Sequence, residues 1–254
     1  ARHPQLLRLV RDDLSRAILA AAPSGRPSVL AATAAAVLQL QMVMHSELKL
    51  QLEAFLRMVL LPLAEPGRED VSQESRRIAL ECVVDLCRQP TFAPDLYVNF
   101  DCDVDRPDVF EELASVLSRG AFPRDGEPFD AEHLLSLEGL LAITAGIAER
   151  STSSEGLDAL PADTLSAPPG SSAPEPDFAR FAAAADERWA LTLEGGYERA
   201  EALRGVRHLK RRLAVCAEHF NASPKKGLAY AQEVGALPDP LDPAATARFL
   251  RRAP

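Results

Sequence analysis

Apolar residues recur every three to four positions along almost the whole chain, which is the spacing of one face of an α-helix. No segment keeps the strict alternation that is typical of a half-buried strand. The pattern therefore predicts an all-α protein. The expected helices cover residues 6–18, 30–63, 70–86, a short stretch around 96, 109–117, 134–147, 178–193 and 197–220, with two more after residues 223 and 242.

Capping residues predict where these helices begin and end. A single helix over 30–63 would be unusually long for a globular domain, so a break is expected near His45 and Ser46, where Ser can cap a new helix. The other expected boundaries are a capping box at Asp70 and Gln73, a left-handed Gly120, N-caps at Asp130, Ser223 and Asp242, and a helix stop at Gly235.

The helix over 134–147 is apolar on nearly every side, which predicts a central position in its domain. Amphipathic helices joined by short turns favour an armadillo or HEAT-like helical superhelix, although no exact repeat is present. The expected domains are a helical domain over 1–150, a disordered acidic Ser/Pro linker over 151–177, connecting helices over 178–207 and a last helical part over 208–254.

Charge and cysteine content exclude some classes of protein. A formal net charge of -9 argues against nucleic acid as a main partner, because binding to phosphates needs clustered Lys and Arg. The four cysteines have no zinc-type spacing and suggest a reducing, cytosolic setting. Residues 27–46 carry no formal charge and are long enough to span a membrane. Alanine favours insertion little and Gln39 and Gln41 oppose it, so a buried helix of a soluble protein is favoured.

An acidic turn is the nearest approach to a metal site. Asp101, Asp103, Asp105 and Glu112 have the spacing of EF-hand ligands, but Arg106 occupies the position that needs glycine. A structural or interaction role is therefore favoured over calcium binding. The five histidines are scattered, and no nucleophile elbow or phosphate-binding glycine loop is present, so the sequence predicts no catalytic residue, metal or cofactor, and a metal-dependent helical enzyme is a distant alternative.

A basic stripe is the second candidate surface. Arg204, Arg207, Lys210 and Arg211 recur at helical spacing and could contact an anionic membrane. A solvated helix face is the simpler interpretation, because charged residues usually lie opposite the core.

Several segments resemble one family. The segment Leu96 to Asp103, with the sequence LYVNFDCD, resembles the box of the domain upstream of the Sec-seven domain in large Arf guanine-nucleotide exchange factors of the Golgi-type, GNOM-like subgroup. The segments starting at Leu48, Val109, Leu117 and His133 are similar to the same subgroup. The segment Phe220 to Leu228, FNASPKKGL, resembles the opening of the Sec-seven domain, which makes 208–254 the first helices of an incomplete catalytic domain.

This resemblance implies a regulatory region and not an exchange catalyst. In the family, a glutamate in the loop Phe-Arg-Leu-Pro-Gly-Glu expels GDP, and that loop does not occur in these 254 residues. The implied partners are the upstream dimerisation and cyclophilin-binding domain of the same protein, an Arf-family GTPase through the full-length parent, and the Golgi membrane, with a cytoplasmic, peripheral location.

The box residues implied to make such a contact, or to hold the fold, are Asn99, Phe100, Asp101, Cys102 and Asp103. A short Asn/Asp turn can also bond its own backbone and cap the helix at Val109, so both roles stay open. A helical-repeat scaffold unrelated to GTPases is the alternative for the whole chain.

Overall fold

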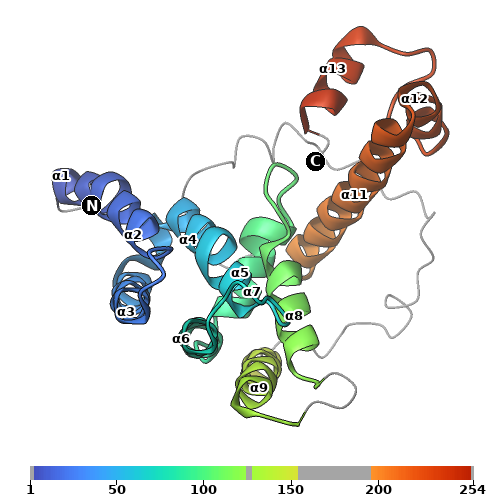
Figure 1. Cartoon of the computed structure of the whole chain (residues 1–254). Coiled ribbons are helices and arrows are strands. Elements are labelled where there is room, and N and C mark those ends of the chain that lie inside the picture. The colour runs from blue at the N-terminus through green and yellow to red at the C-terminus, as the bar shows by residue number, and fades with distance from the viewer. Residues whose placement is uncertain (1–2, 124–127, 154–195, 253–254) are drawn as a thin grey trace. The chain divides into compact units, whose positions relative to one another are not determined.

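The computed structural model describes residues 3–123, 128–153 and 196–252, and every regular element in these ranges is helical, as predicted (Figure 1). Most of the predicted linker over 151–177 lies outside the described residues, as does the connecting helix expected over 178–193. The chain forms two compact units. Unit 1 comprises Ala1–Tyr97 and Val109–Thr192, and unit 2 comprises Val98–Asp108 and Leu193–Pro254.

The first helices of unit 1 follow the predicted boundaries closely. α1 (Pro4–Leu9), a π-helical turn (Val10–Leu14) and α2 (Ser15–Ala21) run together, and Gly25 follows with φ 71°. α3 (Pro27–Met44) ends at a short 3-10 turn (His45–Glu47), after which come α4 (Lys49–Phe55), a second π-helical turn (Leu56–Leu60) and α5 (Leu61–Ala64). The break at His45 is confirmed, but Leu48 and not Ser46 is the N-cap of α4.

The centre of unit 1 is α6 (Gln73–Cys87), which packs against α3, α5, α9 (Ala131–Ser153) and the short α7 (Phe92–Leu96) (Figure 1). Its side chains are buried on several sides, with Val83 and Leu86 fully enclosed. α8 (Val109–Gly120) packs against α5 and α9. The core of unit 1 is therefore assembled around α6.

The prediction that 134–147 is the central helix was wrong. Leu134 and Leu141 of α9 are 56% and 59% exposed, whereas Gly139 and Ile143 lie on the buried face. A Cβ atom on Gly139 would lie 3.0 Å from Cδ1 of Leu117 in α8, so the small residues of α9 admit the close approach. Apolar residues on all sides of a helix do not specify which side packs, and here small residues decide it.

Two predicted helix boundaries also need correction. Asp70 does not cap α6 but pairs with Arg68, and the N-cap is Ser72, whose Oγ accepts a hydrogen bond from the Ser75 N–H at 3.2 Å. Gly120 has no positive φ. It is suited to its position for a different reason, because a Cβ there would lie 2.6 Å from Oγ of Ser136 in α9.

Among the residues that the structure describes, two segments have the length and apolar composition to cross a membrane, Pro27–Glu47 and Ala131–Arg150. In unit 1 the helices that they contain both pack against α6. The buried side chains of α3, which include Leu30 and Val37, fit the predicted role as a core helix.

Asp130 caps α9 as predicted. Its Oδ1 accepts hydrogen bonds from the N–H groups of Glu132 at 2.9 Å and His133 at 3.1 Å. Burial raises the pKa of this carboxyl, but these two backbone donors and the nearby His133 outweigh burial and hold the pKa below its usual value.

Replacing Asp130 with alanine is expected to cost about 1 kcal/mol of stability, because two N–H groups at the start of α9 lose their acceptor. The lowered pKa means that this contribution is present above the carboxyl's unfolded pKa of about 3.9 and is lost as the pH falls through the lower folded value. Urea unfolding at neutral pH and in acid measures both effects. An equal loss at both pH values would contradict the assignment.

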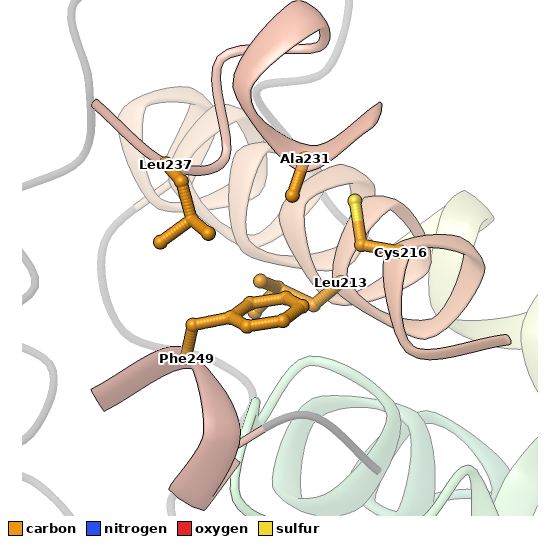
Figure 2. Close-up of a cluster of buried hydrophobic side chains, with 5 residues drawn as sticks. All are labelled: Leu213, Cys216, Ala231, Leu237 and Phe249. Atoms are coloured by element: carbon orange, nitrogen blue, oxygen red, sulfur yellow. The ribbon is translucent and has the colours of Figure 1, made fainter. Parts of the chain in front are cut away.

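Unit 2 is built on α11 (Gly196–Ala222), α12 (Pro224–Glu233) and α13 (Pro243–Arg252). Figure 2 shows its core, in which the side chains of Leu213, Cys216, Ala231, Leu237 and Phe249 converge from these helices and the turn after α12. Val104, which comes from the segment 98–108, packs against the same cluster. Two parts of the chain that are about a hundred residues apart therefore share one core.

The helix ends of unit 2 match the sequence prediction in most respects. Gly235 has φ 72° and ends α12, with the Leu237 N–H donating to the Ala231 carbonyl at 2.9 Å. The Asp242 carboxylate accepts from the Ala245 N–H at 2.8 Å and caps α13. Ser223 is the N-cap of α12, but its side chain makes no capping hydrogen bond.

Candidate interaction site

The box Asn99–Asp103 begins in a π-helical turn (Tyr97–Asp101) directly after α7. Asn99, Phe100, Asp101 and Cys102 are all buried, and Phe100 and Asp101 are fully enclosed. Asp103 is half-buried and its Oδ1 accepts the Asp105 N–H at 3.0 Å, a turn of the kind that short acidic residues form with their own backbone. The box is therefore an interior turn and not an exposed acidic patch.

Two cations of α11 reach the backbone of this turn. Nζ of Lys210 donates to the Phe100 carbonyl oxygen at 2.8 Å, and Nη1 of Arg207 donates to the Asp101 carbonyl oxygen at 3.3 Å. Both cationic side chains are buried. Because a buried ammonium or guanidinium is costly without partners, these bonds hold the turn and the helix in one arrangement.

Asp108 completes the cluster. Its Oδ1 lies 2.5 Å from both Nη1 of Arg207 and Nζ of Lys210, and Oδ1 of Asp101 lies 3.8 Å from Nη2 of Arg207. Two buried cations thus face two carboxylates, which keeps the formal charge of the cluster balanced. This set of Asp101, Asp108, Arg207 and Lys210, together with the box carbonyls, is called the box cluster below.

The structure divides the predicted basic stripe. Arg207 and Lys210 are buried and belong to the box cluster, whereas Arg204 and Arg211 are exposed although they lie only three and four residues from Arg207. The sequence motifs indicated the box and the stripe separately, but no local signal joined residues 106 and 110 positions apart. Asp108 belongs to neither of these sequence motifs, so its role as the shared acid was missed.

Metal and thiol chemistry find little support in the described part of the chain. No group of three or more His, Cys, Asp or Glu side chains is arranged to hold a metal ion there. The four cysteines are buried and unpaired in disulfides. Burial raises the pKa of Cys82 and Cys87 to about 12 and also raises that of Cys216, so these thiols are poor nucleophiles at neutral pH.

The fold and the box cluster define a class of protein: an all-α helical protein in which a buried polar cluster joins two distant segments of the chain. Residues 1–109 match the family model described as "Mon2/Sec7/BIG1-like, HUS domain".

The chain is also similar to curated proteins over nearly its full length. It is 36% identical over 252 residues to the ARF guanine-nucleotide exchange factor GNL1 and 37% identical over 253 residues to GNOM, both from Arabidopsis thaliana. Each alignment covers 98% of this chain and 16% of the relative. The Golgi-specific brefeldin A-resistance guanine nucleotide exchange factor 1 homolog of Caenorhabditis elegans is 28% identical over 272 residues, which cover 91% of this chain and 13% of the relative.

The chain belongs to the large Arf guanine-nucleotide exchange factors, in the subgroup of GNOM and GNL proteins, and contains the HUS domain that lies upstream of the Sec-seven domain in that family. It spans about a sixth of the length of the plant relatives. This membership displaces the alternative of a scaffold unrelated to GTPases. It also confirms the resemblance that the box motif indicated.

Proposed function

We propose that this chain is a regulatory and interaction region of an Arf guanine-nucleotide exchange factor that acts in Golgi vesicle traffic. The relatives are named as guanine-nucleotide exchange factors, and the name of the Caenorhabditis elegans relative also refers to the Golgi. Unit 1 serves as an armadillo or HEAT-like superhelix, and residues 208–254 are the opening helices of a Sec-seven domain. The sequence contains no Phe-Arg-Leu-Pro-Gly-Glu loop, so exchange chemistry lies outside these residues.

The box cluster is the observation that carries this proposal. The chain leaves unit 1 after Tyr97 and returns to it at Val109, and the box between these residues belongs to unit 2, where its carbonyls bond α11. α11 leads directly into the segment that resembles the start of the Sec-seven domain. In this proposal, polar contacts of the box hold α11, the helix that leads into the catalytic domain.

Partners follow from the same role. An Arf-family GTPase would bind through the full-length parent, and the dimerisation and cyclophilin-binding domain upstream would pack on the HUS region. The protein would be cytoplasmic and peripheral at the Golgi membrane. Asn99, Phe100, Asp101, Cys102 and Asp103 act in this proposal mainly by positioning α11, because four of the five are buried.

Amide hydrogen exchange of the whole chain tests whether the box holds α11. Asp101→Ala is expected to speed exchange in α11 between residues 203 and 213 while α6 in unit 1 keeps its protection, because the carboxylate facing Arg207 is lost. Asp105→Ala is the matched control, since Asp105 is exposed on the same turn. Unchanged exchange in α11, together with lost binding of the upstream domain of GNOM, would instead assign the box to a direct partner contact.

A nucleotide assay tests the absence of catalysis. The chain is expected to leave the release of fluorescent GDP from a purified Arf GTPase unchanged, because it contains no exchange glutamate loop. A GNOM Sec-seven domain in the same assay is the positive control. Faster release caused by the chain alone would contradict the proposal.

A further inference from the structure

The cations of α11 separate into two groups once the fold is known. Arg207 and Lys210 are buried in the box cluster. Arg204, His208, Arg211 and Arg212 are exposed, and their spacing of four, three and one residues places them on one face of the helix. No Asp or Glu occurs between Glu201 and Glu218. We call these four exposed residues the outer basic face.

Several described arginines of unit 1 are held differently. Within the described residues, Arg204 and Arg212 have no ion pair with an acidic side chain. By contrast, arginines of unit 1 hold carboxylates in the pairs Arg57–Glu112, Arg68–Asp70, Arg76–Glu132, Arg77–Glu81, Arg88–Glu138 and Arg119–Glu65. Arg204 and Arg212 therefore keep positive charge that a partner can neutralise.

We propose that the outer basic face binds the anionic headgroups of a phospholipid bilayer. Arg204 and Arg212 lie about 12 Å apart along the axis of α11, at roughly 1.5 Å of rise per residue. Arginine on a helix near a membrane is attracted by the negative surface potential of anionic lipids. Val215 continues the same face, and its 40% exposure supplies an apolar contact at the headgroup level.

A bilayer fits this face better than an acidic protein does. The cations follow a line along one helix and so offer charge but little shape for a specific partner to match. The whole chain has a formal net charge of -9, so its overall charge repels an anionic surface. Only a local basic face can attract such a surface. The inference rests on the membrane association in the proposed function and deepens it, and it is independent of the box cluster, whose cations point inward.

Vesicle flotation with the full chain tests this inference. The chain is expected to float with phosphatidylcholine vesicles that contain phosphatidylserine or a phosphoinositide, and to stay unbound with phosphatidylcholine alone or at high salt. The double variant Arg204→Gln/Arg212→Gln is expected to bind roughly 25-fold more weakly, given about a fivefold change for each arginine at the surface.

The matched control removes the same charge elsewhere. Arg16 and Arg26 are exposed in unit 1, and the double variant Arg16→Gln/Arg26→Gln is expected to keep wild-type binding. Equal losses in both variants would overturn the proposal, because net charge alone would then explain binding. Binding to polyglutamate but not to vesicles would overturn it in favour of an acidic protein partner. Neither result depends on the nucleotide-exchange assay or on the protection of α11 amides from hydrogen exchange.

Discussion

Gly227→Ala is expected to destabilise the pairing of α11 and α12 by about 3 kcal/mol, the upper part of the usual range for overpacking. A Cβ at this position would overlap Cα and the backbone nitrogen of Phe220 and lie 2.8 Å from the carbonyl carbon of His219. These are main-chain atoms, so no side-chain rotation relieves the clash and the two helices must separate. Hydrogen exchange of α12 amides in the full chain measures the loss.

Gly235→Ala is the control, because it adds the same methyl group without a clash. No heavy atom lies within 4 Å of the point that a Cβ would occupy there, and the only strain is the positive φ of 72°. The expected cost is therefore about 1 kcal/mol. A Gly227→Ala cost as small as this would mean that α12 can shift on α11, and would contradict the close packing.

Asp108→Ala is expected to destabilise unit 2 by a similar amount, about 3 kcal/mol. This carboxylate is shared by two buried cations, and its removal leaves both Arg207 and Lys210 with less negative charge nearby. A third of the Asp108 side chain is exposed, which places the effect at the lower end for a broken buried pair. The readout is the hydrogen exchange of α11 amides, followed in urea.

Two further variants decide whether unbalanced charge causes the loss of stability in Asp108→Ala. Adding Lys210→Met to Asp108→Ala is expected to restore part of the lost stability, because one unpaired buried cation is removed while its apolar stem is replaced. Asp105→Ala, on the exposed part of the same turn, is expected to change stability by less than about 0.5 kcal/mol. If the double variant is less stable than Asp108→Ala, the cluster is held by packing and not by charge balance.

Much of the fold was accessible from the sequence because its signals are local. The spacing of apolar residues gave the helical class, and the break at His45, the cap at Asp130 and the stop at Gly235 each depend on residues within one helical turn. The errors arose where two local signals competed. Asp70 and Ser72 are both good caps, and the contact of Asp70 with Arg68 decided between them.

The sequence by itself determined the family, the all-α class and the box as the notable motif, since these depend on residue order and local spacing. Tertiary structure decided which helix is central, because the glycines of α9 matter only through the neighbours that they admit. It also decided which cations of α11 are buried and which are exposed. Arg204 and Arg207 are the same residue type and lie three positions apart. Arg204 is exposed, whereas Arg207 is buried against Asp101 and Asp108, because the chain returns to the box after about a hundred residues.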